Sequence, residues 1–160
     1  MNLISTGGCQ ALIDDIRNQL GYDFVSLALA RSGANGYELT WQYAAGNLNE
    51  RYRRIVLQSG KGIAGNVFKT GKPMLIVNAD EEIDRRELYQ YPIVVSERLV
   101  SIGAIPLFEA DRVSGVLLVG YRSEQRVTPD ALSQLEQWLC GRLEASGAKE
   151  LTALDNDGNG

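Results

Sequence analysis

The spacing of hydrophobic residues changes several times along the chain, and each change predicts a new element. Apolar residues recur at three- and four-residue steps over residues 9–20, which predicts an amphipathic helix that stops at Gly21. The apolar run over residues 24–30 predicts a buried strand. Residues 37–44 alternate in polarity and predict its hairpin partner, with the turn at residues 31–36.

The middle of the chain carries shorter patterns. Residues 48–57 predict a second helix, and residues 63–68 predict a third, short helix that begins near Gly62. Residues 74–77 predict a short strand, and residues 80–87 a charged connection. The apolar runs 99–108 and 113–121, joined by a four-residue turn, predict a second hairpin.

The end of the chain has the strongest helix signal. Thr128 is expected to cap the helix and Pro129 to occupy its first turn, and apolar residues follow at helical spacing. From Gly147 the pattern is lost, and residues 147–160 are expected to form a disordered tail. One domain over residues 1–146 follows, of class α/β (α+β), in which an antiparallel sheet carries the two terminal helices together on one face.

Two aromatic residues stand at positions that suit either a core or a pocket. Trp41 lies in the middle of its strand, where parity places Tyr37, Leu39 and Tyr43 on the same face. The indole therefore either packs in the core or forms one planar wall of a pocket. Tyr91 precedes Pro92, which holds it extended, so its hydroxyl either enters a cavity or covers the core.

A glycine-rich segment enters the third predicted helix. Its sequence is Gly60-Lys61-Gly62-Ile63-Ala64-Gly65. The order of residues in a nucleotide-binding P-loop is missing, and no strand directly precedes the segment. A glycine-lined helix start leaves backbone N–H groups free, and with the helix dipole these groups suit a small anion. The alternative is that the glycines only allow a tight turn and close packing.

Composition removes several classes of function. The 160 residues include no histidine, which excludes Ser-His-Asp hydrolysis, histidine-ligated metal and phosphotransfer through histidine. The 16 Lys and Arg against 20 Asp and Glu give a net charge of −4, which argues against nucleic acid as a partner. Cys9 and Cys140 are too few and too far apart for a disulfide framework. We therefore expect no catalytic residue and no metal site.

Membrane and export signals are also missing from the sequence. No segment reaches the apolar run of about 18 residues that a membrane span needs. The first residues lack a basic stretch and a long apolar stretch, so they do not predict a secretory signal. We expect a cytoplasmic protein that does not associate with a membrane.

Two arginine patches stand out in this acidic chain. One consists of Arg51, Arg53 and Arg54, and the other of Arg85 and Arg86. Each is either a solvated face or a docking surface for an acidic partner.

The element order and three segments together resemble the GAF domain family over about residues 10–145. These segments are residues 60–67, residues 69–73 and Ser101-Ile102-Gly103-Ala104-Ile105-Pro106-Leu107. The resemblance implies a ligand pocket between short helices, loops and the sheet face opposite the terminal helices, with a sheet of about five or six strands.

Within that family, residues 41–57, 60–65 and 91–93 are similar to nitrate receptors that consist of one free-standing GAF domain. Such receptors work with an oxygen-sensing histidine kinase, so the resemblance implies a nitrate receptor that modulates a sensor histidine kinase of a two-component system, without a cofactor. The implied nitrate ligands are the Trp41 indole, main-chain groups at Ile63 and Ala64, and Tyr91, Pro92 and Ile93.

Other GAF functions remain as alternatives. Free methionine sulfoxide reductases of this fold use cysteines around the pocket, whereas Cys9 and Cys140 fall in the terminal helices. A non-catalytic dimerisation module is the other alternative, because GAF domains commonly pair through terminal helices. The stripes that could form such a homodimer are Leu12-Ile16-Leu20 and Leu132-Leu135-Leu139.

Overall fold

The computed structural model describes residues 6–145 and 151–152 of the chain. The helices among them are α1 (Thr6–Leu20), α2 (Gly62–Thr70), α3 (Ala79–Glu82), α4 (Pro92–Glu97) and α5 (Pro129–Ala145), with the 3₁₀ helices η1 (Arg51–Arg54) and η2 (Arg85–Gln90). The strands are β1 (Phe24–Gly33), β2 (Gly36–Ala45), β3 (Val56–Gln58), β4 (Met74–Ile76), β5 (Ser101–Glu109), β6 (Arg112–Tyr121) and β7 (Leu151–Thr152).

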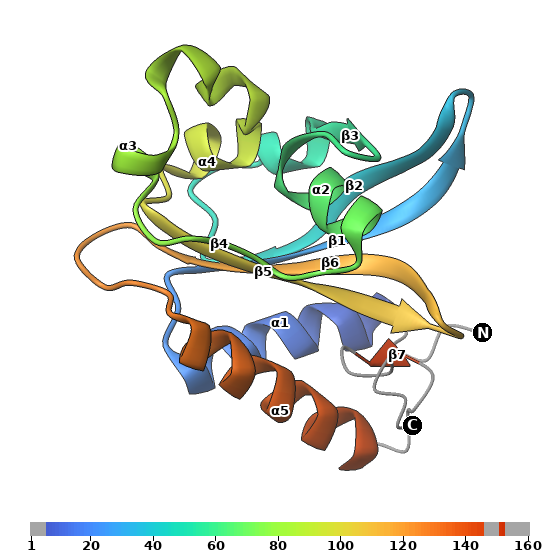
Figure 1. Ribbon diagram of the computed structural model, residues 1–160. Helices are drawn as coiled ribbons and strands as arrows, with labels where there is room; N and C mark the ends of the chain where they lie inside the picture. The colour runs from blue at the N-terminus through green and yellow to red at the C-terminus, as the bar shows by residue number, and fades with distance from the viewer. Residues whose placement is uncertain (1–5, 146–150, 153–160) are drawn as a thin grey trace.

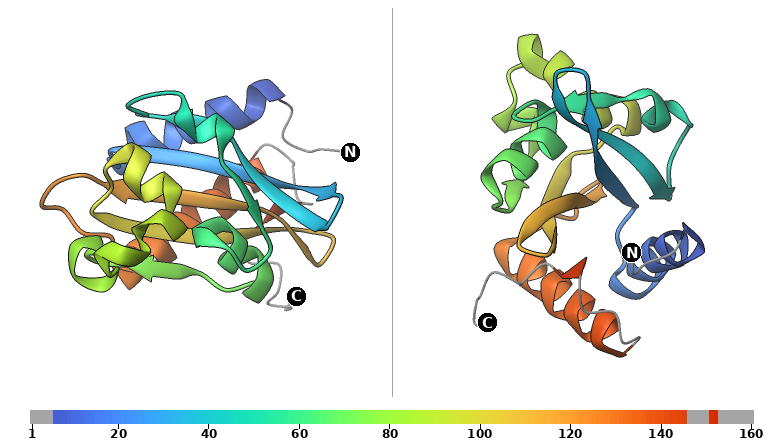
Figure 2. Two further views of the ribbon diagram at one scale, coloured as in Figure 1. Left: turned by 90° about the horizontal axis from the view of Figure 1, so that it is seen from above. Right: turned by 90° about the vertical axis from the view of Figure 1, so that its right-hand side faces the viewer.

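One antiparallel sheet divides the molecule into two layers. Six of the described strands follow the order β3-β2-β1-β6-β5-β4, and β7 pairs with β5. Helices α1 and α5 cover one face, and the short elements α2, α3 and α4 lie over the other (Figure 1). The right-hand view in Figure 2 shows the same separation. The predicted fold class and the placement of the terminal helices are confirmed.

The terminal helices begin and end as their sequences predict. Gly21 adopts a left-handed φ of +84° after α1, and its N–H donates to the Arg17 carbonyl at 3.0 Å. At the start of α5, the Thr128 hydroxyl accepts from the Ala131 N–H at 3.1 Å. The leucines and isoleucines of both stripes pack against the sheet in one core cluster. Both stripes therefore cover the sheet within this chain.

The prediction of a helix over residues 48–57 is wrong. Only η1 forms there, and the chain then extends as β3 along the free edge of β2. Adjacent β-branched residues, Ile55 and Val56, favour this extended backbone. Leu48 and Val56 are about half exposed, at 51% and 49%.

The charged connection contains more regular structure than predicted. Asn78 and Asp84 each cap a short helix, because their side chains accept from the N–H groups of Asp80 and Arg86 at 3.1 and 2.9 Å. Helix α4 follows directly. This segment forms the outer wall of the layer opposite α1 and α5 (Figure 1).

A β-bulge changes the parity of β2. Tyr43 lies opposite Leu27 and Trp41 lies opposite Ala28, so Gln42 is an extra residue on β2. Tyr43 consequently packs with the terminal helices, whereas Trp41 packs with α2. The expectation that Tyr43 shares the face of Trp41 is wrong for this reason.

The predicted tail, residues 147–160, lies outside the described residues except for β7. Those two residues pair with Phe108 and Glu109 at the end of β5. In the described part of the chain, no helix is both long enough and apolar enough to cross a bilayer.

Candidate functional site

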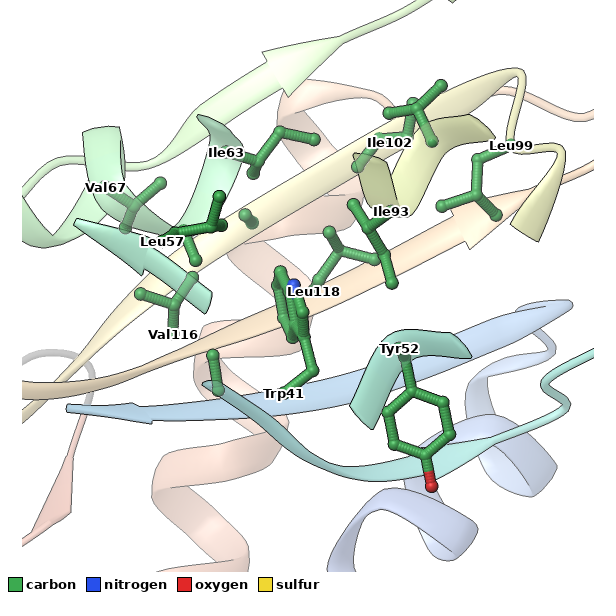
Figure 3. Close-up of a cluster of buried hydrophobic side chains, with 14 of the residues drawn as sticks. Trp41, Tyr52, Leu57, Ile63, Val67, Ile93, Leu99, Ile102, Val116 and Leu118 are labelled. Atoms are coloured by element: carbon green, nitrogen blue, oxygen red, sulfur yellow. The ribbon is translucent and has the colours of Figure 1, made fainter. Parts of the chain in front are cut away.

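The residues singled out by the sequence meet on the sheet face opposite the terminal helices. Trp41 comes from β2, Ile63 and Ala64 from the first turn of α2, and Ile93 from α4, and none of the four exceeds 1% exposure. All four belong to one buried apolar cluster (Figure 3). Tyr91 is partly buried and packs against this cluster.

Pro92 lies beside the cluster as the first residue of α4, and it is half-buried. It fixes the backbone at the start of this helix and donates no hydrogen bond, because proline lacks an N–H group. The structure therefore gathers five of the six residues in or against the cluster and places the sixth at its rim.

Trp41 carries a polar group that the protein does not satisfy. The indole stands up from β2 toward Ile63 and Ile93 (Figure 3). Its Nε1 is buried and finds no hydrogen-bond acceptor within the part of the chain that the structure describes. A buried donor without a partner costs about 1–3 kcal/mol. An acceptor that enters the cluster would remove this cost.

The first turn of α2 supplies further unpaired donors. Lys61 precedes the helix and provides no side-chain cap. Gly65 donates its N–H to the Lys61 carbonyl at 2.9 Å, but no described acceptor takes the amides of Ile63 or Ala64. Helix geometry leaves these first N–H groups without intrahelical partners, and the helix dipole makes this end positive.

The glycines shape this helix start. Gly60 and Gly62 adopt left-handed φ angles of +86° and +64°. Gly65 lies directly against the carbonyl oxygen of Gln58, where a side chain has no room. Two hydrogen bonds close the turn, from Gly60 N–H to the Gly65 carbonyl at 2.7 Å and from Lys61 N–H to the Gln58 carbonyl at 2.9 Å. The glycines therefore make the turn tight, and the same turn leaves the helix amides free.

The segment before α4 lies next to the same helix start. A Cβ atom on Gly62 would come within 3.4 Å of the Gln90 carbonyl oxygen, so the end of η2 touches the start of α2. Tyr91 then accepts from the Val94 N–H at 3.0 Å and opens α4. The Ile93 amide, like those of α2, has no acceptor among residues 6–145 and 151–152.

Several residues of this cluster are missing from the sequence-based prediction. The floor includes Val116 and Leu118 of β6, and the walls include Leu57 of β3 (Figure 3). Tyr52 of η1 also belongs to the cluster, but its ring points away from Ile63 and Ile93. Alternation within residues 113–121 could have placed the two β6 residues on one face. Leu57 and Tyr52 were missed because residues 48–57 were assigned to a helix. Burial raises the pKa of the Tyr52 phenol above its ordinary value, which keeps this group neutral.

Charged side chains lie at the surface around the cluster. All five arginines of the two patches are exposed, and two of them are paired, Arg53 with Glu50 at 2.6 Å and Arg86 with Asp84 at 2.9 Å. A surface hollow of ≈ 740 Å³ between α3, η2 and α4 has lining residues of both charges, including Asp80 and Arg98. This hollow is open and mixed in charge, unlike the buried cluster around Trp41.

No thiol or metal site accompanies the cluster. Cys9 belongs to α1 and Cys140 to α5, both on the opposite side of the sheet (Figure 1). Among the residues that the structure describes, no group of three or more histidine, cysteine, aspartate or glutamate side chains is placed to hold a metal ion. The arrangement offers hydrogen-bond donors in an apolar setting, which is suited to binding an anion.

Comparison with known proteins supplies independent findings. The family model described as GAF domain matches residues 9–138. A comparison with curated proteins finds no match. A hypothetical protein from S. aureus shares 40% identity and a TM-score of 0.70, over 74% of this chain and 95% of that chain.

Two further solved structures are similar to this chain. An NreA protein from Staphylococcus aureus, mutated in its nitrate binding site, shares 38% identity and a TM-score of 0.73, over 79% of this chain and 91% of that chain. The free methionine-R-sulfoxide reductase from Neisseria meningitidis shares 20% identity and a TM-score of 0.65, over 91% of this chain and 80% of that chain. Identity this low shows a shared fold alone.

Proposed function

This chain belongs to the GAF domain family, and from that premise we propose that it is a nitrate receptor. The nitrate site lies between Trp41, the first turn of α2 and the start of α4. The buried, unpartnered Nε1 of Trp41 carries the proposal, because it adds a side-chain donor to the free amides of Ile63, Ala64 and Ile93. Tyr91 and Pro92 complete the site at its rim.

The chemistry of nitrate fits these groups. Nitrate is flat, monovalent and weakly hydrated, so an apolar pocket can desolvate it at moderate cost. Its oxygens accept hydrogen bonds, and backbone N–H groups at a helix start supply partial positive charge without a counter-ion. The aromatic ring of Trp41 and the side chains of Ile63 and Ile93 match the planar faces of the ion. The likeness to NreA supports the same ligand.

Nitrate titration tests the proposal directly. We expect calorimetry to give 1:1 binding, and we expect nitrate to raise the melting temperature, because a ligand of the folded state stabilises it by mass action. At a limit of about −1.5 kcal/mol per atom, the four atoms of nitrate supply at most about −6 kcal/mol, so the dissociation constant is tens of micromolar or weaker. Sulfate at equal ionic strength serves as the control. No heat and no thermal shift at millimolar nitrate would contradict the proposal.

The receptor is proposed to act in the cytoplasm on a sensor histidine kinase of a two-component system. The exposed arginine patches support docking to an acidic partner surface. Regulation requires that the nitrate-free and nitrate-bound forms differ in affinity for the kinase. We expect nitrate to reduce the amount of purified kinase retained by the immobilised chain. Equal retention with and without saturating nitrate contradicts the regulatory role and leaves the nitrate site intact.

The proposed function is binding, with no catalytic step. A methionine sulfoxide reductase needs a reactive thiol beside its substrate, and Cys9 and Cys140 both lie across the sheet from the candidate site. Turnover of free methionine sulfoxide by the purified chain would favour the enzyme instead. Absence of both this activity and nitrate binding would leave a dimerisation module.

A further inference from the structure

We propose that Glu97 is a positioning residue for the nitrate site. Its buried carboxylate holds α4 in place, so that Ile93 stays close to Trp41 and to the start of α2. This inference rests on the proposed function and adds a residue that does not itself contact the ligand.

Glu97 is the last residue of α4, and its side chain is fully buried. Oε1 accepts two hydrogen bonds, from Arg122 Nη2 at 2.6 Å and from the Leu48 N–H at 2.8 Å. Oε2 is buried and has no hydrogen-bond partner among the described residues. One carboxylate oxygen therefore joins α4 to two other segments at once.

Two more hydrogen bonds reinforce this junction through the main chain of α4. Arg122 Nε donates to the Glu97 carbonyl at 2.8 Å, and Asn49 Nδ2 donates to the Ser96 carbonyl at 3.0 Å. The main chain of Arg122 is held in place as well, because its backbone N–H donates to Asp23 Oδ2 at 2.8 Å. The end of α4 is thus attached to the segment after β2 and to the residue after β6.

These attachments determine where the start of α4 lies. Strand β2 carries Trp41 and β6 carries Leu118, which are a wall and a floor residue of the site. Helix α4 has only six residues, too few to be stable alone. The residue after it, Arg98, adopts a left-handed φ of 53°. Glu97 and Ile93 are four residues apart, so one turn of helix transmits the position of the first to the second.

The Glu97–Arg122 ion pair can position α4 without adding to the stability of the fold. A buried ion pair is often no better for stability than apolar side chains of similar volume, because both charges lose their hydration. The unpartnered Oε2 adds to this cost. Replacing both partners by apolar residues should therefore preserve the fold while it removes the directed hydrogen bonds that hold α4.

The test is the double variant Glu97→Met with Arg122→Met. We expect nitrate to bind at least about tenfold more weakly in a variant that still unfolds cooperatively. The melting temperature without nitrate should fall only modestly, because the Leu48 N–H and the Glu97 carbonyl lose their partners. The matched control is Asp15→Met with Arg142→Met, which removes the 2.7 Å ion pair between α1 and α5 on the opposite face. This control should leave nitrate affinity unchanged.

A second variant and a spectroscopic signal distinguish a loss of positioning from a loss of folding. Asn49→Ala removes the hydrogen bond to the Ser96 carbonyl, together with the one that Asn49 Oδ1 accepts from the Arg51 N–H at 2.8 Å, and it leaves Glu97 and Arg122 in place. It should also weaken nitrate binding. In NMR spectra, nitrate should shift the Trp41 Nε1–H signal of the wild type, and the double variant should need more nitrate for the same shift. Unchanged nitrate affinity in the folded double variant, or in Asn49→Ala if the double variant does not fold, overturns the role of Glu97. A wild-type chain that binds no nitrate overturns the proposed function, and this role with it.

Discussion

Gly65 in the first turn of α2 rests directly on the carbonyl oxygen of Gln58 at the end of β3. The contact joins the helix that opens the candidate site to the edge strand of the sheet. It is possible only because Gly65 has no side chain, and it brings the turn that carries the free amides of Ile63 and Ala64 against β3.

We expect Gly65→Ala to damage both stability and nitrate binding. The added methyl group meets main-chain atoms that cannot rotate away, so α2 has to move outward. Overpacking of this kind costs about 1–3 kcal/mol. Urea unfolding measures the stability, and calorimetry measures the nitrate affinity, which should fall because the amides are displaced.

The matched control is Gly141→Ala in α5. A Cβ atom there meets no atom within 4 Å. Alanine is favoured over glycine inside a helix by about 1 kcal/mol, so this variant should be neutral or slightly more stable. If Gly65→Ala behaves like Gly141→Ala in both measurements, the close approach of α2 to β3 is not required for the site.

Trp41→Phe tests the donor that carries the proposed function. Phenylalanine keeps an aromatic ring in the cluster and removes only Nε1–H and part of the ring. A hydrogen bond to a charged group contributes about 1.5–3 kcal/mol, so nitrate affinity should fall by at least about tenfold. The stability loss should be smaller than the about 3–5 kcal/mol typical of an alanine at such a position.

Trp138→Phe provides the comparison on the other face of the sheet. Trp138 lies in α5, and its Nε1 donates to Gln19 Oε1 at 3.2 Å. Its replacement should leave nitrate binding as it is in the wild type. Equal nitrate affinity in the wild type and in a folded Trp41→Phe variant would remove Trp41 from the site.

The long elements of the fold were predictable because each has one clear hydrophobic period. Helices α1 and α5 follow the helical spacing of their apolar residues, and the two hairpins follow runs of strand-forming residues. Local signals at Gly21 and Thr128 also marked where a helix stops or starts. Nothing distant in the chain is needed to form these features.

The errors arise where distant partners decide the local structure. Residues 56–58 become a strand because the edge of β2 is available to pair with them. Gln42 becomes a bulge through its pairing with β1, and this reverses the face of Tyr43. Parity along one strand cannot reveal an inserted residue, because the insertion is defined only by the partner strand.

The candidate site was predictable only where a local sequence pattern marks it. The glycines around Ile63 and Ala64 indicate a helix start with free N–H groups, and the family resemblance adds Trp41 and Tyr91. Glu97 gives no such signal, because one glutamate in a sequence looks like any surface acid. Only the fold shows that its carboxylate is buried against Arg122.

The free energy of unfolding should decrease at high pH, because the Tyr22 phenol is buried in the folded state. Burial, with a smaller contribution from Tyr121, raises the pKa of the Tyr22 phenol from its ordinary value of 10.0 to about 12. The unfolded chain then loses this proton first, so the free energy of unfolding decreases as pH rises from about 10 to about 12. Two pKa units correspond to roughly 2.7 kcal/mol at most.

Urea unfolding at about pH 9 and about pH 11.5 measures this effect. Tyr22→Phe should remove the part of the decrease that Tyr22 causes, whereas Tyr89→Phe should not, because the Tyr89 side chain is 77% exposed. The same alkaline decrease in Tyr22→Phe and in the wild type would show that another group is responsible.

Tyr91→Ala tests the rim of the nitrate site. Tyr91 packs against the buried cluster, two residues before the free Ile93 amide, and in the proposed site its hydroxyl and ring cover the bound anion. Loss of a hydrogen bond to a charged ligand costs about 1.5–3 kcal/mol, which predicts a dissociation constant for nitrate raised by about tenfold or more. Tyr89→Ala, two residues earlier and 77% exposed, is the control and should bind nitrate as the wild type does. Calorimetry on both variants decides the question, because equal affinity in a folded Tyr91→Ala protein would place the anion away from the η2–α4 segment.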